Sequence, residues 1–291
     1  MIIVYNPTAG RRRAALLWRV LDVLAASGVR LDLARTTCAG HAATLAREAA
    51  LLGARLVVAA GGDGTIAEVA RGLQGTGAAL GIIPLGTANV LANELDLSFV
   101  PQACAAALAF GRTRALWPGV ATGASGERLF VQMLGVGFDA AVVHRLPLRL
   151  KRIAGRGAYV VQSLREMGRY PFPLVAVRLD GVEMQAASVV VTKGRLYAGR
   201  YELAPAACSA ERGFQVALFG HAGALGGPLG AALYGSALPL GLLPRAPGLR
   251  LVQAREIEVS GSLPVQTDGD PSGSAPLRIV DAREPIRVVV G

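Results

Sequence analysis

The residues best suited to chemistry lie in one glycine-rich run that directly follows an apolar segment, Gly61-Gly62-Asp63-Gly64-Thr65. Glycines allow positive φ and let a backbone turn its N–H groups toward one point, and a helix beginning at Thr65 adds a positive N-terminal end. Phosphate is the natural ligand of such a loop. Asp63 differs, because a carboxylate repels phosphate unless Mg²⁺ or a proton intervenes. A plain tight β-α turn is the alternative, and the acid favours a functional loop.

Two further loops have the same character. Pro84-Leu85-Gly86-Thr87-Ala88-Asn89 follows a later apolar run, and Asn6-Pro7-Thr8-Ala9-Gly10 follows the first one, just before three arginines at 11–13. Each alone is compatible with ordinary turn chemistry. Because ligands of open α/β sheets bind beyond the carboxyl ends of the strands, the three loops together predict a single crevice.

A second acidic feature lies far along the chain, in Asp268-Gly269-Asp270. A carboxylate in such a turn is able to accept a proton from a hydroxyl group. Asp-Gly is also a favoured pair in hairpins, so a purely structural turn is the alternative.

The elements that must position these loops alternate regularly before about Gly111. Apolar runs predict buried strands and amphipathic patterns predict helices between them. The strands are expected at Ile2–Tyr5, Val29–Leu33, Arg55–Ala60 and Leu80–Ile83, and the helices at Arg12–Ala26, His41–Leu52 and Thr65–Leu73. Four β-α repeats imply right-handed crossovers and a parallel sheet with helices on both faces.

The second part of the chain predicts strands that Gly, Pro and polar turns separate, with one helix at about Gly157–Met167. These strands are Leu129–Leu134, Leu174–Leu179, Ser188–Thr192, Phe214–Phe219, Arg255–Val259 and Arg287–Val290. We therefore expect an α/β fold in which a parallel-sheet nucleotide-binding domain, residues 1–115, precedes a mostly antiparallel β-rich domain, residues 116–291. The last strand is free to return to the first domain.

Composition narrows the function classes. The 291 residues are 52% hydrophobic and 17% charged, which excludes wholesale disorder and suits about two domains. Aromatic residues make up 5%, which argues against a nucleic-acid partner bound by base stacking. A formal charge of +10 favours a phosphate-bearing partner, either a nucleotide or an anionic membrane. The three separated cysteines predict no disulfide framework and suit the cytoplasm.

Some common classes lack their sequence signals. We find no secretory signal ahead of the first strand. Gly213–Pro244 is uncharged and long enough to cross a bilayer, but its glycines and prolines favour strand, loop and apolar helix instead. The P-loop pattern is absent, and the first β-α turn lacks the glycine fingerprint of dinucleotide dehydrogenases.

In order along the chain, the three loops resemble the signatures of the diacylglycerol kinase catalytic-domain family, which includes bacterial lipid kinases and sphingosine kinases. The resemblance extends through Gly135-Val136-Gly137-Phe138-Asp139, Tyr197-Ala198-Gly199, Leu203-Ala204-Pro205 and Asp268-Gly269-Asp270, and so covers nearly the whole chain. It implies ATP-dependent phosphorylation of a lipid hydroxyl, such as that of diacylglycerol, with ATP and Mg²⁺ as cofactors. It also implies that the active site lies in the interdomain cleft.

The resemblance also assigns roles to residues. Asp270 is expected to be the general base, with Asp268 as its rival, and Asp63 would organise Mg²⁺-ATP or act as the base itself. Asp63 and Asp268 are the candidate metal ligands. The residues expected to bind ATP are Asn6, Thr36, Gly61, Gly62, Asp63, Gly64, Thr65, Gly86, Thr87 and Asn89.

Three departures from the family pattern bear on activity. Ala67 replaces an asparagine before Glu68, and an acid in the strand entering the second domain is replaced around Trp117-Pro118. Family members often carry an acid directly before the glycine matching Gly213, where a structural metal binds. This chain has Arg212 there, with Glu211 one residue earlier, so we predict no metal at that position.

Two alternatives to a lipid kinase stay open. A soluble kinase of the NAD kinase type also uses a Gly-Gly-Asp-Gly-Thr loop, although the Gly86–Asn89 loop and the acidic pair favour the lipid branch. The departures leave room for a catalytically inactive, nucleotide-binding membrane adaptor.

A lipid substrate requires contact with a bilayer. Arg145 to Arg169 interleaves cationic and apolar side chains, a pattern that lays charge on anionic head groups while apolar groups dip below them. We expect a cytoplasmic protein that associates peripherally with the membrane, and a homodimer is compatible with the sequence.

Overall fold

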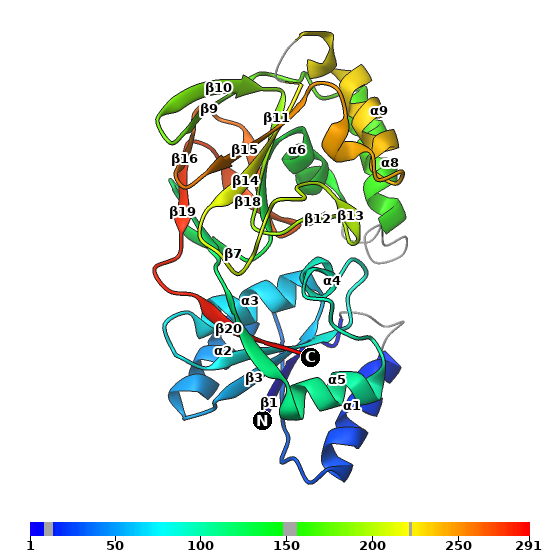
Figure 1. Cartoon of the computed structure of the whole chain (residues 1–291), viewed down its shortest axis with the longest axis vertical. Coiled ribbons are helices and arrows are strands. Elements are labelled where there is room, and N and C mark those ends of the chain that lie inside the picture. The colour runs from blue at the N-terminus through cyan, green and yellow to red at the C-terminus, as the bar shows by residue number, and fades with distance from the viewer. Residues whose placement is uncertain (9–13, 148–155, 221–222) are drawn as a thin grey trace. The chain divides into compact units, whose positions relative to one another are not determined.

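The computed structural model describes residues 1–8, 14–147, 156–220 and 223–291 (Figure 1). It contains two compact units, one formed by Met1–Trp117 together with Arg283–Gly291 and the other by Pro118–Ala282. The predicted arginine triplet at 11–13 and part of the predicted basic membrane segment, residues 148–155, lie outside the described residues.

The first unit is built on a six-stranded sheet in the order β2-β1-β3-β4-β20-β5. The first five of these strands run parallel, and β5 pairs antiparallel with β20. The last strand of the chain, whose place the sequence left open, therefore lies inside the first unit. The strands are β2 (Asp32–Arg35), β1 (Ile2–Tyr5), β3 (Leu56–Gly61), β4 (Ala79–Pro84), β20 (Ile286–Val290) and β5 (Arg112–Leu116).

Helices cover both faces of this sheet, as the β-α rhythm predicted. On one face, α1 buries Leu17, Val20, Leu21 and Leu24, the i, i+3, i+4, i+7 spacing of an amphipathic helix, against Ile3, Val58 and Ile83 and against α5. On the other, α2 and α3 pack against each other and against the sheet. The helices are α1 (Ala14–Ala26), α2 (His41–Leu51), α3 (Asp63–Leu73), α4 (Val90–Glu94) and α5 (Pro101–Phe110).

The second predicted strand was misplaced. The apolar run Val29–Leu33 suggested it, whereas β2 spans Asp32–Arg35. Val29 and Leu31 pack against the core at the end of α1, and pairing with β1 begins only where the Asp32 N–H donates to Met1 O at 3.0 Å. Apolar residues thus mark the approach to this edge strand rather than the strand itself.

The second unit contains two six-stranded sheets in which neighbouring strands pair antiparallel. One has the order β10 (Val182–Ala186), β9 (Val175–Leu179), β16 (Ile257–Val259), β19 (Leu277–Asp281), β6 (Gly119–Gly123) and β7 (Gly126–Phe130). The other has the order β15 (Leu249–Ala254), β14 (Phe214–Phe219), β11 (Ser188–Thr192), β8 (Met133–Gly137), β17 (Pro264–Thr267) and β18 (Asp270–Ser274). A short ribbon joins β12 (Leu196–Tyr197) and β13 (Tyr201–Glu202).

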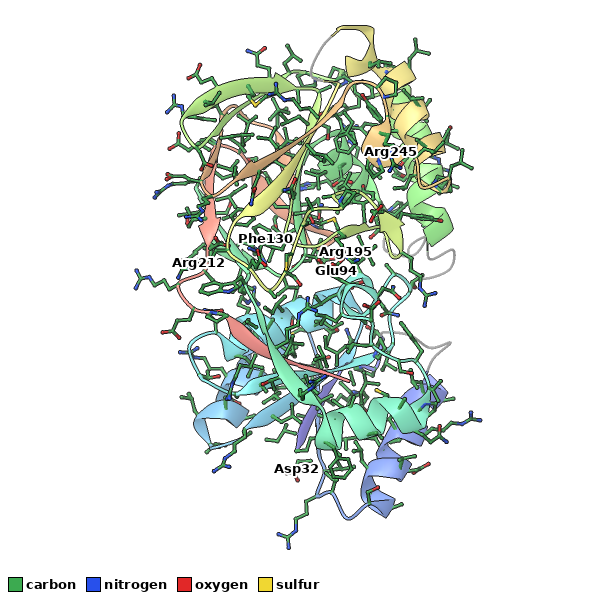
Figure 2. All side chains as sticks on the ribbon, in the orientation of Figure 1. Asp32, Glu94, Phe130, Arg195, Arg212 and Arg245 are labelled. Carbon is green, nitrogen blue, oxygen red and sulfur yellow. The ribbon has the colours of Figure 1, made fainter. Side chains whose placement is uncertain are left out.

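One hydrophobic core fills the space between the two sheets. Val175, Val177 and Leu179 alternate with exposed residues along β9, and Phe130, labelled in Figure 2, is fully buried in the same core. In contrast, β8 and β11 are buried throughout. Helix α6 (Phe138–Arg145) packs on β8, β11, β17 and β18, α8 (Arg156–Met167) packs on α6, and α9 (Pro228–Ala237) packs on α8. Two 3₁₀ segments, η2 (Gly223–Gly226) and η3 (Leu243–Arg245), flank α9.

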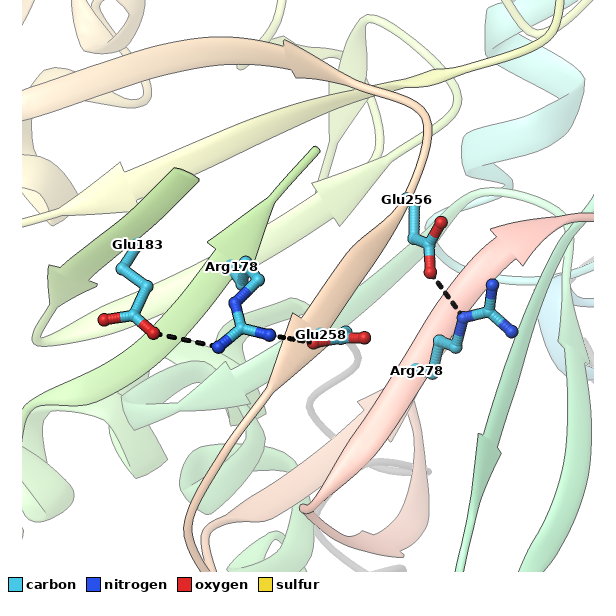
Figure 3. A network of polar contacts seen from close by, with 5 residues as sticks. All are labelled: Arg178, Glu183, Glu256, Glu258 and Arg278. Carbon is cyan, nitrogen blue, oxygen red and sulfur yellow. Dashed lines mark hydrogen bonds and ion pairs between the residues drawn. The ribbon is translucent and has the colours of Figure 1, made fainter. Parts of the chain in front are cut away.

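In the sheet of the second unit that contains β9, the face turned away from the core carries cross-strand ion pairs (Figure 3). Arg178 contacts Glu183 on β10 at 2.9 Å and Glu258 on β16 at 3.2 Å. Charged side chains of both signs keep this face hydrophilic, whereas the opposite face of the same sheet is apolar and forms part of the core. The uncharged run of Gly213–Pro244 forms β14, α9 and their connections, and no described helix is long and apolar enough to span a bilayer.

Candidate functional site

The sheet order of the first unit creates a topological switch point between β1 and β3. From β1 the chain continues to β2 on one side, and β3 and β4 are then added on the opposite side of β1. Ligands of open α/β sheets bind beyond the carboxyl ends of the strands at such a point. The Asn6 N–H, just past β1, donates to Ala60 O of β3 at 3.1 Å, and Asn6 Nδ2 donates to Thr65 Oγ1 at 3.3 Å. Two of the predicted loops therefore meet there.

The loops after β3 and β4 touch through their glycines. A Cβ on Gly86 would lie 2.5 Å from Gly62 Cα, and a Cβ on Gly61 would lie 2.5 Å from the Thr65 side chain. Leu85 and Gly86 donate their N–H groups to Gly61 O at 2.8 and 3.2 Å. The sequence argument attributed these glycines to positive φ, and this reason was wrong. Gly62 has φ −92°, and neither Gly61 nor Gly86 is left-handed, so close packing of two backbones is what requires them.

Asp63 is the first residue of α3 and connects it to α4. Its Oδ1 accepts the N–H groups of Val90 at 2.6 Å and Leu91 at 3.4 Å, at the start of α4. Burial raises the pKa of the Asp63 carboxyl, and the backbone hydrogen bonds oppose that rise. The predicted roles of Asp63 toward Mg²⁺ or as a base stay predictions, with the constraint that one of its oxygens already serves α4.

Asn89 lies at the junction of the Gly86 loop and α4 in a left-handed conformation, with φ 48°. Its Nδ2 donates to Gly86 O at 2.7 Å, while its buried Oδ1 has no hydrogen-bond partner. A buried acceptor left unpaired is costly, and the expected role of Asn89 in binding ATP stays a prediction. Of the other predicted contacts, Thr87 is exposed, and buried Thr36 donates its N–H to Tyr5 O at 3.0 Å.

Glu68 is a residue to which the sequence analysis gave no role. Its Oε1 accepts the Gly40 N–H at 2.8 Å and its Oε2 accepts the Ala42 N–H at 3.1 Å, so it fixes the start of α2 to α3. A carboxylate at a helix N-terminus satisfies N–H groups that the helix leaves unpaired. Glu68 thereby holds the loop that follows Thr36.

In the second unit, Asp268 and Gly269 form the two-residue turn between β17 and β18. Both have positive φ, 49° and 83°, as tight hairpins favour. The Asp268 carboxylate accepts three backbone N–H groups, from Val131 at 2.8 Å, Gln132 at 2.8 Å and Met133 at 3.0 Å. The hairpin alternative therefore describes the backbone correctly, and Asp268 binds main chain, which weighs against its predicted roles as base and metal ligand.

Asp270 is exposed at the start of β18, and the turn before it is held by a buried polar network. The Gly269 N–H donates to Gln266 Oε1 at 2.8 Å, and Gln266 Nε2 donates to Asp139 Oδ2 at 2.9 Å. The Tyr197 hydroxyl donates to the other oxygen of Asp139, which is the second residue of α6. Sequence reasoning missed this network, because its members are far apart along the chain and Gln266, which joins Gly269 to Asp139, lay in none of the quoted motifs.

Burial controls the protonation of this network. It raises the pKa of Asp139, while hydrogen bonds from Tyr197 and Gln266 act in the opposite direction. Burial, and then the neighbouring Asp139, raise the pKa of Tyr197 well above its usual value. The Tyr197 hydroxyl therefore stays protonated and donates a hydrogen bond to Asp139.

The described residues contain no group of three His, Cys, Asp or Glu side chains able to hold a metal ion. A kinase does not need such a cage, since Mg²⁺ is commonly bound by one or two carboxylates together with phosphate oxygens and water.

Comparison with known proteins agrees with this architecture in both units. Residues 1–119 match the family described as "Diacylglycerol kinase catalytic domain", and residues 132–290 match the "YegS C-terminal NAD kinase beta sandwich-like domain". A protein named "Diacylglycerol kinase" from Bacillus subtilis is 33% identical over 209 residues, 70% of this chain and 68% of that protein. A protein from Pseudomonas putida named "Probable lipid kinase YegS-like" is 32% identical over 256 residues, 87% of this chain and 82% of that protein.

Solved structures confirm the fold. A crystal structure from Bacillus anthracis str. Sterne matches the whole chain with a TM-score of 0.80 at 21% identity, over 94% of that chain. Another from the same organism, described as a diacylglycerol kinase, gives 0.70 at 18% identity over 96% of that chain. The chain belongs to the family of lipid kinases related to diacylglycerol kinase, and its second domain is of the YegS type.

We predict that Gly86→Ala destabilises the first unit, because the new Cβ would meet the backbone of Gly62 and the two loops must separate. The expected loss is about 1–3 kcal/mol. Gly62→Ala is the matched control, since its Cβ would lie at a less severe 3.2 Å from Gly86 Cα. Trp18 and Trp117 both belong to the first unit, so tryptophan fluorescence in a urea titration reports its unfolding. A Gly86→Ala midpoint equal to that of the unchanged protein would contradict the packing argument.

We predict that Asp139→Asn removes a pH dependence of stability. With a raised pKa in the folded state, Asp139 retains a proton that the unfolded chain has already released, so its contribution to stability falls as pH rises through that interval. Asparagine can still accept from Gln266 and donate to Tyr197. The melting temperature of the variant minus that of the unchanged protein should therefore increase as pH rises above about 4. Asp22→Asn, exposed on α1, controls for loss of one carboxylate. A difference that does not vary with pH would refute the assignment.

Proposed function

We propose that the protein transfers the γ-phosphate of ATP to the hydroxyl of a lipid, either diacylglycerol or a related lipid alcohol. The observation that carries this proposal is the contact between the Gly62 and Gly86 backbones, in the loops that follow β3 and β4 next to the β1/β3 switch point. This contact fixes the first turn of α3, and the main-chain N–H groups of that turn are suited to bind phosphate oxygens. Family membership supports the same reaction class.

The nucleotide contacts follow from the donors and acceptors of the first unit. Gly62 and Gly64 lie at the start of α3, where backbone N–H groups suit phosphate oxygens. Asn6 and Thr65 form a hydrogen-bonded pair beside them, and Asn89 Oδ1 supplies an acceptor for a donor of ATP. Mg²⁺ would accompany ATP and neutralise the charge of its phosphates.

Asp270 is the acid that we propose as general base for the lipid hydroxyl. Asp270 is exposed at the end of a fixed turn, where a substrate can reach it. Gln266 and Asp139 hold that turn through the Gly269 N–H, which is how a base is kept in one orientation. Asp139 is in this proposal a positioning residue.

A second candidate is a nucleotide kinase that phosphorylates NAD. The family description of the second domain names an NAD kinase β sandwich, so the sandwich fold alone does not choose between the acceptors. The names of the relatives favour lipid.

We predict that the purified protein, given ATP labelled in the γ-phosphate, labels a component of a lipid extract and not NAD. Asp270→Asn should lower kcat by about 10²–10⁴ with little change in ATP affinity, because it removes proton acceptance and leaves the nucleotide loops intact. Asp270→Glu should retain much of the activity, and Asp22→Asn is the neutral control.

The outcomes separate the candidates. Labelling of NAD alone supports the nucleotide kinase, and ATP binding without transfer to lipid or NAD supports an inactive adaptor. An Asp270→Asn variant with full activity would remove Asp270 from the reaction.

We also propose that α8 and the region around α9 meet the membrane surface. Exposed apolar side chains on these neighbouring elements include Val160, Val161, Leu164, Leu229, Leu240 and Leu242. Arg165, Arg169 and Arg245 are exposed near them in sequence. The only acid between Arg145 and Arg169 is Glu166, which is buried and paired with Arg145. Basic and apolar character together suits an anionic bilayer. Formation of a homodimer stays a prediction.

We predict that the protein sediments with vesicles containing anionic lipid at low ionic strength and is partly released at high salt, because salt screens the charge attraction. Leu164→Ser with Leu229→Ser should weaken binding at both salt concentrations, whereas Leu33→Ser, equally an exposed leucine but in the first unit, should not. Binding that is independent of salt, or unchanged in the double variant, would exclude this surface.

A further inference from the structure

A lysine ammonium lies fully buried in the second unit. Lys193 directly follows β11, and its side chain has no solvent exposure. Its Nζ donates to Glu211 O at 3.0 Å, to Gly213 O at 2.7 Å and to Asp281 Oδ1 at 2.7 Å, and it lies 4.6 Å from the centre of the Phe214 ring. Lysine is rarely buried in this way unless it is paired.

The geometry requires the charged form. An ammonium has three hydrogens for the three acceptors, whereas a neutral amine has two and would turn its lone pair toward an oxygen. Asp281 completes the arrangement, because its Oδ2 accepts the Gly213 N–H at 2.7 Å. The segment from Glu211 to Gly213, whose last residue has φ 95°, is thus held from both sides.

The three oxygens around Nζ form the kind of ligand set that a hard cation takes. Two backbone carbonyls and one carboxylate converge on one point, as they do around Ca²⁺ or Mg²⁺. The resemblance implies a structural metal next to Gly213, with an acid at the position of Arg212. In this chain that acid is an exposed arginine, labelled in Figure 2.

A divalent cation does not fit this donor set. The ammonium already occupies the centre of the three oxygens, and a second cation beside it would meet strong repulsion in a buried environment. We infer that Lys193 is an internal cation that takes the place of a bound metal ion, so that the second unit is stable without a divalent metal.

The position of this cation explains what it holds. Asp281 is the last residue of β19, and the next residue, Ala282, donates its N–H to Pro118 O at 2.9 Å. Pro118 and Ala282 are the two ends of the second unit. Lys193 therefore connects three segments, namely the end of β11, the segment at Glu211 and the end of β19, after which the chain leaves the second unit.

The test uses the full chain without nucleotide and follows far-UV circular dichroism on heating. We expect the melting temperature of the unchanged protein to be the same in EDTA and in millimolar Mg²⁺ or Ca²⁺. Lys193→Met keeps the volume but removes the charge, which leaves the partly buried Asp281 carboxylate without its counter-ion, so the melting temperature should fall by about 10 °C in either condition.

A second variant converts the site. Lys193→Ala with Arg212→Asp removes the ammonium and introduces an acid where the resemblance has one, so its melting temperature should rise by about 5 °C when Ca²⁺ or Mg²⁺ is present at 100-fold its Kd. Arg212→Asp alone is the matched control and should show no metal response, because Lys193 still fills the site.

The inference is overturned if EDTA lowers the melting temperature of the unchanged protein, or if elemental analysis finds one divalent ion per dialysed chain. A Lys193→Met variant as stable as the unchanged protein also overturns it. The EDTA comparison needs no variant, so a Lys193→Met chain that fails to fold does not prevent the test. None of these readouts depends on kinase activity.

Discussion

The approach of two backbones at Gly62 and Gly86 is the constraint on which the proposed nucleotide site depends. With any Cβ at Gly86 the two loops would collide, and the carbonyl of Gly61 could not accept both the Leu85 and Gly86 N–H groups. The contact fixes the start of α3 next to the loop that ends in Asn89. Helix N-terminal N–H groups are thereby placed at one end of the sheet before any ligand arrives, which is the preorganisation that the proposed phosphate binding needs.

Several carboxylates in or beside the expected motifs bind main chain in the structure. Asp63 holds the start of α4, Glu68 holds the start of α2, and Asp268 holds the connection before β8. Each joins two segments that hydrogen bonds within sheets or helices do not reach, and buried backbone groups need such partners. Exposed Asp270 is for that reason the acid that we propose as the base, and Asp139 is connected to the turn before it through Gln266.

The sequence was sufficient where a local pattern determines the structure. The β-α rhythm predicted the parallel sheet, and the loop motifs predicted which strand ends meet, because both depend on neighbouring residues. It failed where distant partners decide. The strand at Val29–Leu33 was displaced because core packing and pairing with β1 require different residues. The bond between Gln266 and Asp139 depends on β17 pairing with β8, in which Val265 lies opposite Val136, and no local pattern encodes that register.

Arg212 and Lys193 show why a departure from a family pattern must be interpreted together with its surroundings. Read alone, the arginine at 212 suggests that a metal site has decayed and that the segment beside it is loose. The carbonyl oxygens of Glu211 and Gly213 and the carboxylate of Asp281 nevertheless still converge, and buried oxygens in that arrangement repel one another unless a positive charge lies among them. A side chain supplies that charge permanently. A dissociable ion supplies it only above a threshold concentration, so the lysine makes this end of the sandwich independent of the Mg²⁺ supply on which the proposed phosphoryl transfer depends.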